Sequence, residues 1–157
     1  YQTYGVVPDV MSTAKGIAGG VPCGPMMAKE KVAEAFVPGD HASTFGGNPL
    51  ATAAGNVVVD ELLGGLLDNV KEQGAYLREK LEEVSAKHKD LVKDVRGIGL
   101  MQGMELTEPA GDYIAKAIDM GLLLVGAGKY IIRFVPSLIV SKEDIDKAME
   151  ILDKALG

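Results

Sequence analysis

Cysteine, histidine and tryptophan are scarce in this chain of 157 residues. Tryptophan is absent, and Cys23 is the single cysteine, which excludes a disulfide within the chain and is compatible with a reducing compartment. The two histidines, His41 and His88, lie far apart in the sequence and form no metal-ligand pattern with Cys23. We therefore expect no disulfide scaffold and no metal centre, and we expect a cytoplasmic location.

The chain also lacks a basic excess and a long apolar run. Its formal net charge is −6, whereas a surface for nucleic acid or anionic lipid needs a basic face. No uncharged apolar segment approaches the roughly 20 residues that span a bilayer, and no basic-plus-apolar leader opens the sequence. We expect neither nucleic-acid nor membrane partners. The chain begins at Tyr1 without an initiator methionine, so we expect a processed protein or a piece of a longer one.

Glycine, in contrast, is abundant, with 20 residues, and hydrophobic residues make up 47% of the chain, enough for a sizeable core. Residues 1–48 are rich in glycine and proline and show no long helical period. Within them we expect a short buried strand over residues 21–28 and a short helix over residues 29–36, stopped by Pro38-Gly39.

Helices are expected in the middle of the chain. Asn48 can cap free amides and Pro49 suits the first helical position, so a helix should run from there to Leu63 and bend or break at Gly64-Gly65. A second helix follows, with a seam of residues spaced by three and four, namely Leu67, Val70, Gly74, Leu77, Leu81 and Val84. This seam should pack against a neighbouring element or against another chain.

Strands and helices alternate after Asp90. We expect strands over residues 91–96, 99–106, 122–125 and 130–135, with a helix over residues 108–120 that ends at Gly121. The last helix should begin at Ser141, because Asp144 follows at the spacing of a capping box. Together, these elements predict an α/β chain with a compact strand–helix–strand unit at its C-terminal end.

Lys15 is the only charged residue between Asp9 and Lys29. It lies among small residues and glycines, which suggests a backbone folded tightly around one reactive amine. A desolvated lysine loses its proton more readily and can then condense with an aldehyde. The alternative is a loop lysine whose head reaches water.

Residues 41–48 place two hydroxyls, Ser43 and Thr44, and two glycines directly before the expected helix start at Asn48. Hydroxyls, free amides and a helix N-terminus together suit an oxyanion such as phosphate. An elaborate helix cap and turn explains the same pattern equally well.

Arg133 lies inside an otherwise apolar strand, Ile131-Ile132-Arg133-Phe134-Val135. A buried arginine there must pair with a carboxylate. That carboxylate could be structural, or it could belong to a substrate held by two parallel hydrogen bonds.

Two other patterns are weak. Gly97-x-Gly99-x-x-x-Gly103 resembles a dinucleotide fingerprint, but that motif must lead from a strand into a helix, and Met104-Glu105-Leu106 continues a strand. Cys23 and His41 could be imagined as nucleophile and base, but no third residue orients them, and a cysteine between prolines is usually a small buried hydrophobe.

Three segments together resemble the class III aminotransferases, which are pyridoxal phosphate enzymes of fold type I. Residues 4–22, with Ala14-Lys15-Gly16 and Gly19-Gly20, resemble the cofactor-lysine segment, and residues 41–50 resemble the phosphate segment. Arg96-Gly97-Ile98-Gly99-Leu100 and Ile132-Arg133-Phe134-Val135-Pro136 are similar to motifs of the C-terminal domain. The resemblance covers essentially the whole chain, in the family's order.

The resemblance implies a role for four residues. Lys15 would hold the aldehyde of pyridoxal 5'-phosphate covalently and then act as the base that moves the substrate proton. Thr44 would bind the cofactor phosphate, in this family typically across the interface of a homodimer. Ser43 would lie beside the substrate, and Arg133 would receive a substrate carboxylate.

The likeness is strongest to the subgroup that transfers an amino group from N-acetylornithine to 2-oxoglutarate, giving glutamate, in arginine biosynthesis. Ala127-Gly128 ahead of Ile131-Ile132-Arg133-Phe134 is similar to that subgroup's pattern. Enzymes that act on ornithine, succinylornithine or 4-aminobutyrate share much of it and remain alternatives.

One departure from the family bears on activity. The family's aspartate that pairs with the pyridinium nitrogen has no counterpart here, because Asp9 is too near Lys15. The resemblance therefore implies only the C-terminal part of a fold type I enzyme: residues 1–48 from the large domain, connecting helices over residues 49–90 and a small domain over residues 91–157. We expect the isolated chain to be inactive. The rival is a non-catalytic assembly module of the same fold that uses the helical seam as its partner surface.

Overall fold

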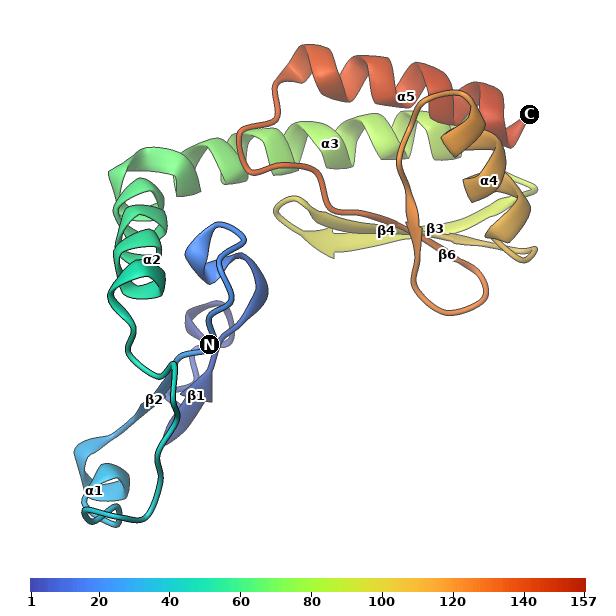
Figure 1. Cartoon of the computed structure of the whole chain (residues 1–157). Coiled ribbons are helices and arrows are strands. Elements are labelled where there is room, and N and C mark those ends of the chain that lie inside the picture. Colours follow the sequence, from blue (N-terminus) through green and yellow to red (C-terminus); the bar gives the residue numbers. More distant parts are fainter. The chain divides into compact units, whose positions relative to one another are not determined.

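The computed structural model describes all residues 1–157, which form two compact units, Tyr1–Gly64 and Gly65–Gly157. The first contains two short strands and two α-helices, and the second contains a four-stranded antiparallel sheet and three α-helices (Figure 1). The strands are β1 (Val10–Ser12), β2 (Met26–Ala28), β3 (Val92–Ile98), β4 (Met101–Leu106), β5 (Val125–Gly126) and β6 (Ile131–Phe134). The α-helices are α1 (Glu30–Ala33), α2 (Pro49–Glu61), α3 (Leu67–Lys87), α4 (Gly111–Asp119) and α5 (Lys142–Leu156).

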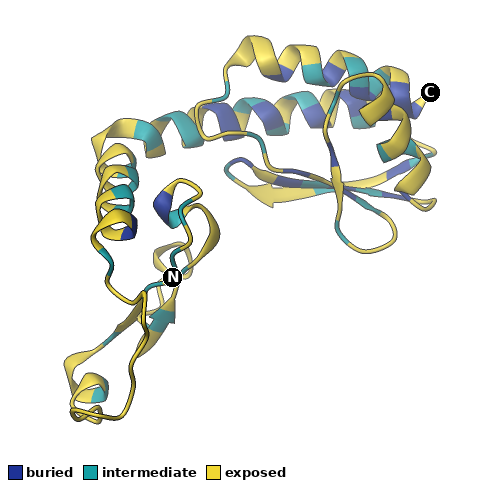
Figure 2. Ribbon diagram, viewed as in Figure 1, coloured by how far each residue is buried: buried dark blue, intermediate teal, exposed yellow.

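The first unit has little interior of its own. Strands β1 and β2 pair antiparallel, with Val10 opposite Ala28 and Ser12 opposite Met26. This unit buries only Ala18 and Ala51, whereas the second unit contains all the other buried residues (Figure 2). The expected buried strand over residues 21–28 is wrong in both length and burial: β2 begins only at Met26, which is 57% exposed. Prolines at 22 and 25 cannot donate to a strand ladder, which explains the late start.

Helix α2 begins as the sequence predicts. The Asn48 side-chain Oδ1 accepts a hydrogen bond from the Ala51 amide at 2.9 Å, and its Nδ2 donates to the Phe45 carbonyl at 2.8 Å. Pro49 occupies the first turn, where its missing N–H leaves no unmade bond. One side chain therefore ties the preceding turn to the helix.

The predicted break at Gly64-Gly65 is confirmed. Residues Leu62–Leu66 form a wider, π-type turn, and Gly65 has φ 126°, a left-handed value that a residue with a Cβ rarely adopts. The boundary between the compact units falls at the same two glycines. Helical structure thus continues from α2 to α3 only through a backbone conformation that glycine permits.

The helical stretch Pro49–Lys87 is long and apolar enough, by length and composition alone, to cross a bilayer, with a window of mean hydropathy 1.4. Asp60 and Glu61 interrupt the apolar residues of α2, and Gly65 interrupts the helix itself. From Gln73 onward the stretch buries side chains inside the second unit. We treat this composition as weak evidence for a membrane span.

In the second unit, the sheet has the strand order β3-β4-β6-β5 and is covered on one face by helices (Figure 1). Helices α3 and α5 lie side by side, and α3 packs against β3. The core between sheet and helices contains Leu81, Met104, Ile132 and Leu152, none of them exposed to solvent. Burial of about 25 cal/mol per Å² of apolar surface stabilises this unit.

The helical seam on α3 packs inside its own unit. Gly74, Leu77, Leu81 and Val84 are buried, and Leu77, Leu81 and Val84 join the core with the sheet and α5. Only Leu67, at the start of the helix, remains 46% exposed. The sequence left open whether this seam packs against a neighbouring element or against another chain. The neighbouring element is correct, and the hypothesis of an assembly module therefore loses the α3 seam as its partner surface.

Other elements of the second unit follow the sequence closely. Ser141 Oγ accepts from the Asp144 amide at 3.2 Å, and Asp144 Oδ2 accepts from the Ser141 amide at 3.2 Å, so the predicted capping box forms. Gly121, with φ 93°, follows α4 as predicted. The expected strand over residues 122–125 is wrong in extent, because only Val125–Gly126 pair with β6.

The turn between β3 and β4 shows what the pattern Gly97-x-Gly99-x-x-x-Gly103 forms. Residue Gly97 pairs with Gln102 and Ile98 with Met101, so the segment is a strand–turn–strand hairpin. A Cβ on Gly97 would lie 2.1 Å from the Met101 carbonyl oxygen, which explains why glycine is needed there. No helix follows, and the dinucleotide fingerprint is therefore excluded, as expected.

Acid should weaken the contact between α3 and α5. Lys87 Nζ lies 2.7 Å from Asp153 Oδ2, His88 Nε2 lies 2.8 Å from Asp153 Oδ1, and hydrogen bonds with Lys87 and then His88 lower the pKa of Asp153. A carboxylate with a lowered folded pKa contributes stability above its unfolded value of about 3.9, and this is lost as pH falls through the folded value. We expect the free energy of unfolding to fall below about pH 4, and to fall less steeply in Asp153→Asn. Urea titrations across this range check this, with the exposed Asp68→Asn as control.

Candidate functional site

Lys15 opens the short 3₁₀ helix η2 (Lys15–Ala18), three residues after β1 ends at Ser12. Its φ of 58° makes it the only residue other than glycine with a left-handed backbone. Such a conformation costs energy and persists only where surrounding structure imposes it, often at functional sites. The side chain is exposed and makes no hydrogen bond or ion pair, so within these 157 residues the amine reaches water, the second of the two alternatives left open by the sequence.

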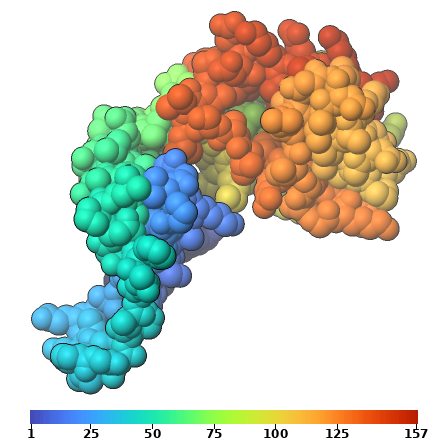
Figure 3. All heavy atoms as spheres, in the orientation of Figure 1, coloured from blue at the N-terminus to red at the C-terminus, as the bar shows by residue number.

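Packing against α2 holds the Lys15 backbone in place. Ala18 is 1% exposed, a Cβ on Gly55 would lie 3.6 Å from the Ile17 carbonyl oxygen, and a Cβ on Gly19 would lie 3.7 Å from Val58 Cγ2. Figure 3 shows the two segments, blue and green-cyan, in contact. The glycines thus allow η2 to approach the helix closely, while Lys15 itself projects toward solvent.

Thr13 adds an unpaired polar atom two residues before Lys15. Its Oγ1 is buried and has no hydrogen-bond partner. Such an atom is costly unless something satisfies it. Sequence reasoning missed this atom, because a threonine two residues before a lysine forms no distinctive pattern.

Ser43 and Thr44 lie in the turn that precedes α2. The Gly46 amide donates to the Ser43 carbonyl at 3.2 Å, and Gly47 has φ 67°. Both hydroxyls are exposed, and neither makes a hydrogen bond, because the cap of α2 is provided by Asn48. The hydroxyls are therefore available beside a helix N-terminus, a geometry that suits an anion.

The structure does not bring the two candidate segments of the first unit together. The segment after Lys15 packs beside the middle of α2, with Ile17 near Gly55 and Gly19 near Val58, whereas Thr44 precedes the first turn of that helix. No hydrogen bond joins Lys15 to Ser43 or Thr44.

Arg133 lies on β6 and is exposed, so the expected burial is wrong, and no carboxylate of this chain pairs with it. Ile132 and Phe134 face the core, so Arg133 points to the opposite, uncovered face of the sheet. The nearest acid on that face is already taken: Glu105 Oε1 lies 2.6 Å from Lys93 Nζ, and its Oε2 lies 2.7 Å from Arg96 Nη1. Hydrogen bonds from Lys93 and Arg96 hold the pKa of Glu105 below its ordinary value. Arg133 is left with a free guanidinium.

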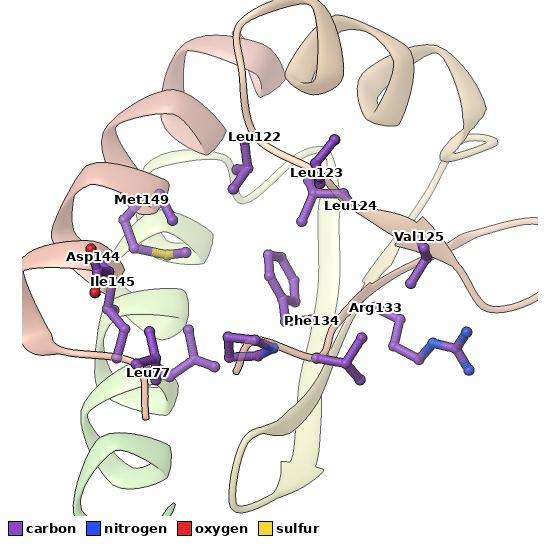
Figure 4. Close-up of a pocket in the computed structure, with 14 residues that line it drawn as sticks. Leu77, Leu122, Leu123, Leu124, Val125, Arg133, Phe134, Asp144, Ile145 and Met149 are labelled. Atoms are coloured by element: carbon purple, nitrogen blue, oxygen red, sulfur yellow. The ribbon is translucent and has the colours of Figure 1, made fainter. Parts of the chain in front are cut away.

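An apolar hollow of about 440 Å³ lies beside β6 and was not predicted from the sequence (Figure 4). Leu77, Leu124, Phe134, Ile145 and Met149 are among the residues that line it. The guanidinium of Arg133 points away from this space in Figure 4, and Asp144 at the other end serves the cap of α5. The hollow therefore offers apolar contact without a free polar group. The run Leu122-Leu123-Leu124 was the one sequence signal for it.

A sequence pattern describing the class-III aminotransferases matches residues 1–156. The chain belongs to the class-III aminotransferase family. Lys15 and the adjacent hydroxyls of Ser43 and Thr44 thus belong to a chain whose family depends on pyridoxal phosphate in general.

Acetylornithine aminotransferases are prominent among the similar proteins. The chain is 52% identical over 159 residues to the acetylornithine aminotransferase of Caldanaerobacter subterraneus and 50% identical over 162 residues to that of Thermosynechococcus vestitus. These alignments cover 100% of the chain but only 40% and 39% of the relatives. The chain therefore spans about 40% of the length of these enzymes.

Solved structures of the family share the fold. The acetylornithine aminotransferase of Elizabethkingia anophelis has a TM-score of 0.90 at 28% identity, over 99% of this chain and 42% of that one. An ornithine aminotransferase of Plasmodium yoelii has a TM-score of 0.86 at 32% identity, again over 99% of this chain and 42% of that one. The chain thus corresponds to a C-terminal portion of a fold type I transferase.

The residues present fit pyridoxal phosphate in part. Lys15 has an unpaired amine for an aldehyde, and Ser43 and Thr44 have unpaired hydroxyls near the N-terminus of α2 for a phosphate. The buried, partnerless Thr13 Oγ1 close to Lys15 is a further group that a neighbour would satisfy. The chain offers no free acid near Lys15 to pair with the nitrogen of the pyridine ring. Asp9 is the acid near Lys15 in the sequence, and it pairs with Lys29 at 2.9 Å.

Proposed function

We propose that this chain is the C-terminal portion of a cytoplasmic, homodimeric aminotransferase that uses pyridoxal phosphate to transfer an amino group from N-acetylornithine to 2-oxoglutarate. The observation that carries the proposal is about 50% identity to acetylornithine aminotransferases along the whole chain. The free amine of Lys15, held in a left-handed backbone against α2, supports it independently.

Lys15 is proposed to hold the cofactor aldehyde and to carry the proton between substrate and cofactor. Bound pyridoxal phosphate supplies an electron sink for the substrate carbon next to the transferred nitrogen. A lysine suits the proton transfer because its amine alternates between accepting and donating at one position. Its exposure in this chain means that the remainder of the enzyme must exclude water from it.

Thr44 is proposed to bind the cofactor phosphate and Ser43 to lie beside the substrate. In this proposal the site is shared between two copies, and the turn of one copy serves the lysine of the other. The N-terminus of α2 adds favourable partial charge for the phosphate.

Arg133 is proposed to receive a carboxylate of the amino donor or of 2-oxoglutarate. Its guanidinium is free on the uncovered face of the sheet, while neighbouring cations are paired. Two parallel hydrogen bonds from arginine to a carboxylate give both affinity and orientation. The same residue can serve both half-reactions, because both substrates carry a carboxylate.

The test supplies, from a relative, the part of the enzyme that this chain does not contain. We would replace the corresponding C-terminal part of the Caldanaerobacter enzyme, with which the chain shares 52% identity, by residues 1–157. The chimaera should form glutamate from N-acetylornithine and 2-oxoglutarate, whereas the 157-residue chain alone should not. A folded, dimeric chimaera without transaminase activity, or an active isolated chain, would contradict the proposal.

Ornithine is the second candidate donor. The chain is 32% identical to the ornithine aminotransferase structure of Plasmodium yoelii and 28% identical to the acetylornithine aminotransferase structure of Elizabethkingia anophelis, so the solved structures do not separate the two donors. The same chimaera, assayed with ornithine in place of N-acetylornithine, compares the two donors. We expect the higher kcat/KM with N-acetylornithine.

A further inference from the structure

The uncovered face of the sheet carries a row of residues directly across three strands. Gly103 on β4 pairs with Arg96 on β3 and with Arg133 on β6. Residues directly opposite in antiparallel strands point to the same face and are near neighbours. Adjacent strands lie about 4.8 Å apart, so the two arginines start about 10 Å from one another with only Gly103 between them.

The two arginines differ in their charge environment. Arg96 Nη1 lies 2.6 Å from Asp94 Oδ2 and 2.7 Å from Glu105 Oε2, and these hydrogen bonds raise the pKa of Arg96. Lys93 pairs with the other oxygen of Glu105. Two cations and two carboxylates therefore balance in this cluster, and Arg133 is the free positive charge of the row.

Gly103 contributes no side chain to the face of the sheet beside Arg133. Its backbone is compatible with other residues, since its φ is not in the left-handed range. A Cβ there would lie 3.3 Å from Ile131 Cγ2, which an alanine accommodates with a small shift. Backbone geometry therefore does not demand glycine at this position, in contrast to Gly97 in the same sheet.

We propose that Gly103 is part of the substrate-carboxylate subsite: its missing side chain keeps open the place beside the Arg133 guanidinium where one substrate carboxylate lies. This rests on the proposed function, because it takes Arg133 as the carboxylate receptor. A side chain at 103 would project between the two arginines, on the same face, and occupy that place. The ion pairs of Arg96 with Asp94 and Glu105 keep that arginine from competing for the carboxylate.

The inference predicts that a longer side chain at 103 weakens carboxylate binding without disturbing the fold. Titration of the ¹⁵N-labelled 157-residue chain with 2-oxoglutarate should move the Arg133 Nε–H resonance in a saturable way. In Gly103→Leu the apparent affinity should fall about tenfold, because the direct ion-paired hydrogen bonds are obstructed. The matched control is Gly111→Leu, at a helix position where a Cβ would meet nothing within 4 Å, and it should bind as the unmodified chain does.

Two results of these titrations would contradict the role of Gly103. An Arg133 resonance that does not respond in the unmodified chain, or equal affinity in Gly103→Leu and Gly111→Leu, overturns the inference. If the amide spectrum shows that Gly103→Leu is unfolded, Gly103→Ala replaces it: a two- to threefold weakening, about half the logarithmic effect, is expected, and unchanged affinity overturns the inference. Lys15→Ala should titrate like the unmodified chain, so failure of cofactor attachment and failure of this inference are read separately.

Discussion

Replacing Lys15 by alanine should abolish covalent attachment of pyridoxal phosphate to the chimaeric enzyme and lower its turnover by about 10²–10⁴-fold. The reason is that one amine serves both as the anchor for the aldehyde and as the group that moves the substrate proton. Borohydride reduction followed by peptide mass mapping locates the attached cofactor, and steady-state kinetics measures the turnover.

Lys29→Ala is the matched control for this experiment. Lys29 lies in the same unit, but its amine is bound to Asp9 at 2.9 Å and faces the Val7 carbonyl oxygen at 3.5 Å. We expect attachment at Lys15 to be unaffected in this variant. Cofactor attached at the native stoichiometry in Lys15→Ala would remove the basis of the proposed function.

A single added methyl group at Gly74 should destabilise the second unit by about 2 kcal/mol, the range of overpacked cores. Helix propensity alone predicts the opposite sign, because glycine inside a helix costs roughly 0.5–1 kcal/mol relative to alanine. At this position α3 approaches the β3–β4 turn closely, and a Cβ would lie 2.6 Å from the Gly99 carbonyl carbon. Backbone cannot swing aside as a side chain can, so the helix and the turn must separate.

Urea unfolding followed by circular dichroism measures the Gly74→Ala effect. Gly111→Ala, at an open position on α4, is the control and should change the unfolding free energy by less than about 0.5 kcal/mol. Equal or greater stability of Gly74→Ala would mean that the close approach of α3 to the turn is wrong.

Local chemistry made the second unit largely predictable. The capping box of Ser141 and Asp144, the glycine after α4 and the apolar spacing of α3 each depend on residues a few positions apart. Such signals act within one element, and they give its type and its buried face. The strand Val125–Gly126 was less predictable, because pairing partners rather than composition fix the length of an edge strand.

The first unit and the candidate site were predicted less well. Residues 21–28 were expected to be buried, yet none of them is, and Lys15, for which a desolvated amine was one of two alternatives, is exposed. The chain spans about 40% of the length of the acetylornithine aminotransferases that it resembles. Composition states what a segment can bury, but burial also requires a partner.

By itself, the sequence determined the family, the helix starts at Asn48 and Ser141, the break at Gly64-Gly65 and the identity of Lys15 as the candidate amine. These depend on neighbouring residues or on motif order. Only the tertiary structure decided that the α3 seam packs in its own unit, that Arg133 faces the uncovered side of the sheet, and that Gly103 lies between Arg133 and Arg96. The physical reason is strand register: a one-residue change would turn each side chain to the other face, and pairing between distant segments sets it.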